Sequence, residues 1–109
     1  MASNKYKINS EDIKDLINPM GYGLISDRIT VDGERVGYMY RDRPEEKEDS
    51  GWRFIAGDET QDYIDDEKNS MMFDLNTIAN YDQAIIPYLV LPVGSELERV
   101  PGKDEFQKL

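Results

Sequence analysis

The chain has 109 residues, a formal net charge of −10, no cysteine and no histidine. This length suits one domain. The missing residue types exclude disulfides, thiolate chemistry and the Ser–His and Cys–His catalytic systems, and they remove the commonest metal ligand. The negative charge argues against nucleic acid or an anionic membrane as a partner, and it favours a basic protein.

The amino-terminal region shows no targeting signal. Residues 1–8 lack the apolar core of a signal peptide, and no stretch is long enough to span a membrane. Together with the absence of cysteine, this predicts a cytoplasmic protein with a flexible leader at 1–9. Ser10 is then expected to cap a short helix whose apolar face holds Ile13, Leu16 and Ile17.

A change of hydrophobic period after Pro19 indicates strands. Residues 24–26 and 29–31 have strand-like composition, and Asp32-Gly33 is a strong signal for a two-residue hairpin turn. The sequence therefore predicts an antiparallel hairpin whose second arm begins near residue 35.

Aromatic residues mark the next two predicted strands. Residues 35–41 alternate so that Tyr38 and Tyr40 share one face, and residues 51–57 form a glycine-bounded strand that holds Trp52. We expect all three rings to pack in the core. The alternative is that Tyr38, Tyr40 and Trp52 line an apolar pocket of a small-ligand-binding regulatory module.

The second half of the chain completes the predicted fold. Its expected elements are a short buried strand at 71–73, a helix from 75 capped by Asp74, an apolar segment at 85–89 and a last strand at 96–100. Residues 102–109 are expected to be a flexible tail. The order of elements predicts a single α+β domain over 10–101, with a mostly antiparallel β-sheet and two short helices.

An acidic segment at 58–67 is the most unusual local feature. Its carboxylates are Asp58, Glu59, Asp62, Asp65, Asp66 and Glu67. A calcium loop starting at Asp58 fails, because Tyr63 occupies the position that needs Gly and Asn69 the position that needs Glu. We therefore expect no metal and no cofactor. Two interpretations remain open, a solvated acidic loop and a docking surface for a basic protein.

Several segments together resemble a known bacterial family. The most specific are Asp-Ser-Gly-Trp-Arg-Phe at 49–54, and Asn-Tyr-Asp at 80–82 followed by Ile-Ile-Pro-Tyr-Leu at 85–89; residues 25–33, 36–41, 57–59, 75–79, 94–95 and 98–99 add to them. From about residue 22 to residue 100 the chain is similar to the Imm33-like immunity proteins of polymorphic toxin systems, formerly a domain of unknown function. The resemblance implies a cytosolic protein that binds and silences a toxin, and it carries over no catalytic residue.

The leading hypothesis is therefore a non-enzymatic immunity protein that occludes a toxin directly. Its acidic surface would suit a basic partner such as a nuclease, and the segment 58–67 is the expected contact surface. A carboxylate-based hydrolase is a third reading, but the sequence selects no pair of acids for it.

Overall fold

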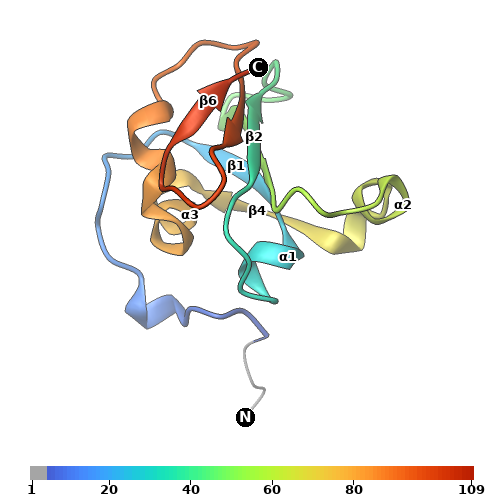
Figure 1. Cartoon of the computed structure of the whole chain (residues 1–109). Coiled ribbons are helices and arrows are strands. Elements are labelled where there is room, and N and C mark those ends of the chain that lie inside the picture. Colours follow the sequence, from blue (N-terminus) through green and yellow to red (C-terminus); the bar gives the residue numbers. More distant parts are fainter. Residues whose placement is uncertain (1–4) are drawn as a thin grey trace.

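In the computed structural model, which describes residues 5–109, six strands form one mixed sheet (Figure 1). Their order across the sheet is β4-β1-β3-β2-β5-β6. The strands are β1 (Tyr22–Ser26), β2 (Tyr38–Arg41), β3 (Asp49–Ile55), β4 (Ser70–Asp74), β5 (Glu96–Arg99) and β6 (Phe106–Lys108). Only β1 and β3 pair in parallel. The predicted α+β domain with a mostly antiparallel sheet is confirmed.

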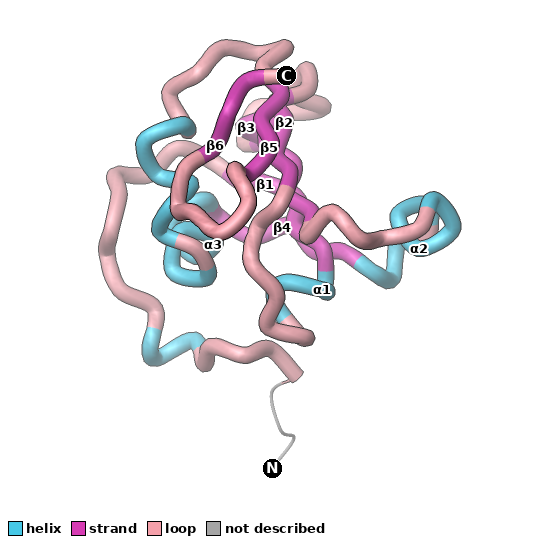
Figure 2. The backbone as a smooth tube through the Cα atoms, viewed as in Figure 1, coloured by secondary structure: helices cyan, strands magenta, loops and turns pink. Residues whose placement is uncertain are grey.

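Short helices and 3-10 turns connect these strands. They are η1 (Ser10–Asp12), α1 (Asp27–Thr30), α2 (Gln61–Asp65), η2 (Glu67–Asn69), α3 (Leu75–Tyr81) and η3 (Gln83–Tyr88). The predicted cap of α3 is confirmed, because the Asp74 side chain accepts a hydrogen bond from the backbone N–H of Thr77. Helix α3 and turn η3 lie together on one side of the sheet, while α2 stands away from the body (Figure 2).

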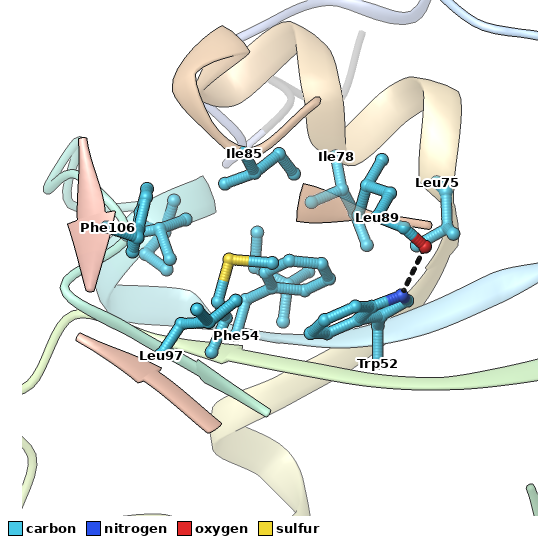
Figure 3. Packing of buried hydrophobic residues seen from close by; sticks show 12 residues of the cluster. Trp52, Phe54, Leu75, Ile78, Ile85, Leu89, Leu97 and Phe106 are labelled. Atoms are coloured by element: carbon cyan, nitrogen blue, oxygen red, sulfur yellow. Dashed lines mark hydrogen bonds between the residues drawn. The ribbon is translucent and has the colours of Figure 1, made fainter. Parts of the chain in front are cut away.

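The core lies between the sheet and the α3–η3 layer (Figure 3). The cluster consists of Ile25, Ile29, Val36, Met39, Trp52, Phe54, Leu75, Ile78, Ile85, Leu89, Leu97 and Phe106. Trp52 is fully buried, as predicted, and its indole N–H donates to the carbonyl oxygen of Leu89 at 3.1 Å. This bond satisfies the single polar group of the ring, so the largest core side chain also fixes the turn that follows η3.

The predicted hairpin at Asp32-Gly33 is wrong. Residues 27–30 form α1 instead of a strand, and the Ser26 hydroxyl caps the helix by accepting from the N–H of Arg28. Gly33, with φ of +85°, donates its N–H to the carbonyl oxygen of Ile29. A glycine with positive φ that donates back to the last turn is a common way for a helix to end. Asp32-Gly33 therefore marks the C-terminus of α1 here and not a hairpin turn. Strand β1 consequently lies between β4 and β3 and does not pair with β2.

The predicted amino-terminal helix is also wrong beyond one 3-10 turn. Ser10 does not cap it, and the chain after η1 is extended. The Asn76 side chain of α3 accepts from the N–H groups of Leu16 and Ile17, at 2.7 and 3.1 Å. These side-chain contacts replace the bonds that a helix would have made within itself. The blue segment in Figure 1 therefore follows α3 as an extended strap.

Both predicted mobile ends make contacts where the structure describes them. Residues 1–4 of the leader lie outside the described residues, but Lys7 donates its N–H to the Thr30 carbonyl oxygen at 2.7 Å. At the other end, the expected tail contains β6, which pairs with β5 and buries Phe106 in the core. The prediction for 102–109 missed this strand because its single aromatic stands among polar residues.

One predicted strand has the wrong burial. Residues 71–73 do belong to β4, but Met71 and Met72 are exposed because β4 is the edge strand of the sheet.

Candidate partner-binding surface

The sheet face that points away from α3 and η3 is partly open to solvent. Side chains alternate along a strand and cross-strand neighbours share a face, so the pairing register assigns each residue. Met39, Phe54 and Leu97 face the core. The alternate residues define what we call the open face: Tyr22, Leu24, Tyr38, Tyr40, Arg53, Ile55, Met72, Glu96 and Glu98. Tyr22 and Met72 are 46% and 41% exposed, which leaves apolar area uncovered.

Tyr38 and Tyr40 lie on this open face, so their predicted place in the core is wrong. The prediction put both in phase with Val36, but Val36 and Met39 are the buried residues, because β2 begins only at Tyr38. The two rings lie 5.5 Å apart between centroids, tilted by 36°. Both are half-buried.

The hydroxyl of Tyr38 orients a carboxylate on the neighbouring strand. It donates a hydrogen bond to Oε1 of Glu96 at 2.7 Å. Burial, followed by this bond to Glu96, raises the pKa of Tyr38 to about 12. The hydroxyl therefore stays protonated at neutral pH and remains a donor.

The alternative prediction of one pocket lined by Tyr38, Tyr40 and Trp52 is wrong. Trp52 pairs with Arg41 and is fully buried on the core side, whereas the tyrosines are on the opposite side of the sheet. The open face has two hollows of its own. One of about 50 Å³ lies between Tyr40, Leu24 and Tyr63 of α2, and one of about 340 Å³ is lined by Tyr38, Tyr40 and Glu96.

Arg53 places a positive charge on the open face, but that charge is neutralised locally. Its Nη2 lies 2.7 Å from Oδ2 of Asp49 and its Nη1 lies 2.9 Å from Oδ1. These bonds hold the pKa of the Asp49 carboxyl well below its usual range. The exposed Glu45 side chain adds a looser contact at 3.6 Å. Since both members of the main pair are buried, the open face does not present a free cation to a partner.

The first two acids of the segment 58–67 have structural partners. Asp58 pairs with Arg28 of α1, Nη2 to Oδ2 at 2.5 Å, and this hydrogen bond lowers the pKa of the carboxyl. Glu59 accepts from the N–H groups of Ala56 and Gly57, both at 2.8 Å. These two carboxylates therefore hold the loop that follows β3.

The remaining four acids lie on the projecting part of the segment. Asp62 and Asp65 belong to α2, Asp66 caps η2 by accepting from the N–H of Lys68, and Glu67 begins η2. All four are exposed. Ile64, between them in sequence, is 43% exposed and lines the smaller hollow of the open face. The structure thus brings this acidic projection to the border of the open face.

Sequence reasoning missed Glu96 and Glu98 as surface companions of the tyrosines. The alternation Glu96-Leu97-Glu98 in β5 could have predicted that both carboxylates face away from the core. This local pattern does not predict the strand order, which places Glu96 opposite Tyr40 and Glu98 opposite Tyr38.

Residues 5–109 show neither a membrane-spanning helix nor an acidic metal site. No helix there is long and apolar enough to cross a bilayer. In the same range, no three or more Asp and Glu side chains are grouped so that they could hold a metal ion.

The segments that carry the family resemblance form structural contacts in this fold. In 49–54, Asp49 pairs with Arg53, and the Ser50 hydroxyl donates to the carbonyl oxygen of Tyr22 at 2.5 Å. In 80–82, Asp82 pairs with Arg99 and accepts from the N–H of Val36 at 3.0 Å. These contacts show that the two most specific motifs help to hold the fold together.

Comparison with known proteins gives one match. No curated protein and no solved structure matches the chain. Residues 23–109 match the family described as the Immunity protein Imm33 domain, which covers the whole sheet except the first residue of β1. The chain therefore belongs to the Imm33 immunity protein family.

Proposed function

We propose that this chain neutralises a protein toxin by binding it directly, one molecule to one, without catalysis. The observation that carries the proposal is the open face of the sheet, a partly uncovered layer in a protein whose other face is packed against α3 and η3. Tyr, Met and Arg are enriched at protein interfaces, and Tyr22, Met72 and the two β2 tyrosines fit that composition. Membership of an immunity family supplies the class of partner.

The acidic projection is the proposed rim of this interface. Asp62, Asp65 and Glu67 are exposed, and none of the three caps a helix or pairs with a cation in residues 5–109. With a net charge of −10, the chain would attract a basic toxin and accelerate their encounter. Apolar contacts on the open face would then hold the complex, since dissociation is governed by the desolvated centre of an interface.

The first experiment asks whether neutralisation is stoichiometric. The toxin is defined as the protein that co-purifies with the tagged chain from its source cells and arrests growth when it is expressed alone. Titrating its activity with purified chain should reach complete inhibition at one molar equivalent. Inhibition by a small fraction of an equivalent would show catalysis and contradict occlusion. If no co-purifying protein arrests growth, the immunity function itself is contradicted.

The second experiment tests the acidic rim. The triple variant Asp62→Asn, Asp65→Asn, Glu67→Gln removes three charges from the projection. Its matched control, Glu11→Gln, Asp12→Asn, Asp15→Asn, removes three exposed charges from η1 and the extended segment after it. We expect the first variant to associate with the toxin roughly tenfold more slowly and with a weaker salt dependence than the control. Equal association rates for the two variants would place the contact surface elsewhere.

A further inference from the structure

Strands β2 and β5 present a strip of alternating aromatic and acidic side chains on the open face. Tyr40 is opposite Glu96, and Tyr38 is opposite Glu98. The hydrogen bond from Tyr38 uses Oε1 of Glu96, so this carboxylate is held in place while Oε2 makes no bond in residues 5–109. A fixed carboxylate beside two tyrosine rings is an arrangement suited to a cation.

No cation from residues 5–109 forms an ion pair with the acids of this strip. Within residues 5–109, neither Glu96 nor Glu98 has a Lys or Arg partner. Arg41 is close in sequence, but its guanidinium donates to the carbonyl oxygens of Ser50 and Leu91, at 2.9 and 2.7 Å. Acids elsewhere do have internal partners, including Asp82 with Arg99 and Asp58 with Arg28. The strip therefore keeps a negative charge that the fold leaves uncompensated.

Beside the strip lies the hollow of about 340 Å³, which is lined by Tyr38, Tyr40, Arg41, Asp42, Gly94, Ser95 and Glu96. Its volume equals that of roughly ten liquid waters, which is room for one long side chain. Asp42 adds a second carboxylate to this lining, and it accepts from the N–H of Arg43. The lining thus combines two tyrosine rings with two carboxylates, and the guanidinium of Arg41 is already bound to backbone carbonyl oxygens.

We propose that Tyr38, Tyr40 and Glu96 form a receptor site for one Lys or Arg side chain presented by the toxin. The inference rests on the proposed function and adds the chemistry of the contact. The aliphatic stem of the incoming side chain lies along the tyrosine rings, and its charged head reaches Glu96. Charge complementarity selects this occupant, because the strip offers acceptors and π-faces and no free cationic donor.

The test on the purified chain–toxin pair uses Tyr40→Leu and Glu96→Gln, with Glu11→Gln as the matched control. Tyr40→Leu removes the π-face and keeps apolar bulk, and Glu96→Gln removes only the charge. We expect each to raise the Kd for the toxin about threefold to tenfold, and Glu11→Gln to leave it unchanged. Unchanged urea midpoints, read from Trp52 fluorescence, would show that the variants are folded. If both variants are folded and bind the toxin with wild-type affinity, the proposed receptor site is wrong.

A second measurement does not require the toxin. Nuclear magnetic resonance spectra of the chain are recorded during titration with N-acetylarginine methylamide, and then with the citrulline analogue, which has the same shape without the charge. We expect arginine-specific shifts at Tyr38, Tyr40 and Glu96 that Glu96→Gln removes. Equal chemical-shift changes with both probes, or no change with the arginine probe, would contradict the proposed receptor site. A chain that binds the arginine probe but inhibits no toxin would instead contradict the proposed function alone.

Discussion

Arg53 and Asp49 face each other through two hydrogen bonds although both belong to β3. Four residues of regular strand span roughly 13 Å, so the contact requires a bent backbone. The bend is visible in the register, because β1 advances from Tyr22 to Leu24 while β3 advances from Asp49 to Arg53. Gly51, with φ of +90°, lies at the centre of this bulge. The bulge thus lets one strand supply both halves of a buried ion pair.

Replacing Gly51 by Ala should destabilise the fold more than the same change at another positive-φ glycine. A Cβ at residue 51 would lie 2.1 Å from the carbonyl oxygen of Asp42, whereas one at Gly57 would meet nothing within 4 Å. Both residues have positive φ, so Gly57→Ala reports the backbone strain alone. We expect losses of about 3 kcal/mol or more and about 1 kcal/mol, respectively. Urea unfolding followed by Trp52 fluorescence measures both losses. Equal losses would mean that the backbone relieves the contact with the Asp42 carbonyl oxygen at no additional cost.

Removing the Asp49 charge should be strongly destabilising. Asp49→Asn leaves the buried Arg53 guanidinium with its bond to the Trp52 carbonyl oxygen and, within residues 5–109, one carboxylate, Glu45, whose side chain is 87% exposed and 3.6 Å away. Leaving one member of a buried pair uncompensated typically costs about 3 to 5 kcal/mol. The matched control Glu45→Gln should lose less than about 1 kcal/mol. Similar urea midpoints for the two variants would show that Asp49 contributes no more than a surface pair.

The same carboxylate predicts a loss of stability in acid. The Arg53 hydrogen bonds hold the pKa of Asp49 well below its usual range, so the folded state binds this proton less readily than the unfolded state does. Its contribution is complete above the unfolded pKa of about 3.9 and is lost as pH falls below that value towards the folded pKa. Burial raises the pKa of Asp27, which acts in the opposite sense.

The measurement is therefore a comparison between variants. Urea midpoints of the wild type and of Asp49→Asn are followed from neutral pH to about pH 2.5, a range that includes the unfolded pKa of about 3.9. The advantage of the wild type over Asp49→Asn should shrink progressively as the pH falls below about 3.9. A constant difference between the two proteins across that range would contradict the assignment to Asp49.

Local signals predicted the elements that are stabilised locally. The Asp74 cap lies three residues before the N–H of Thr77 that it binds, so the start of α3 could be read from the sequence. Strand β3 and the burial of Trp52 followed from a run of aromatic and aliphatic residues between glycines. The acidic segment was equally visible as a charge run.

Errors arose where a distant partner decides the outcome. Asp32-Gly33 fits a hairpin and a helix end equally well; here Gly33 ends α1, and β1 pairs with the distant β3 and not with β2. Leu16 and Ile17 fit a helical face, but Asn76 accepts their N–H groups. The tyrosine–glutamate strip depends on β5 lying next to β2, a choice of strand order that no local pattern encodes.

The carboxy-terminal strand provides a direct test of such a distant contact. Phe106 is 7% exposed, and its ring lies 5.3 Å from that of Tyr88 and 4.9 Å from the guanidinium carbon of Arg99. Its N–H donates to the Tyr88 hydroxyl at 3.0 Å. Phe106→Ala should therefore lower the free energy of unfolding by about 3 kcal/mol, the loss typical of a buried phenylalanine.

Leu109→Ala is the matched control for this prediction, because Leu109 follows the same strand and is 67% exposed. It should change the free energy of unfolding by less than about 0.5 kcal/mol. Hydrogen exchange gives an independent measurement, since the amide of Phe106 should be protected in the wild type. If Phe106→Ala is as stable as Leu109→Ala and that amide exchanges freely, residues 102–109 are the flexible tail that their composition predicts, and β6 contributes nothing to the core.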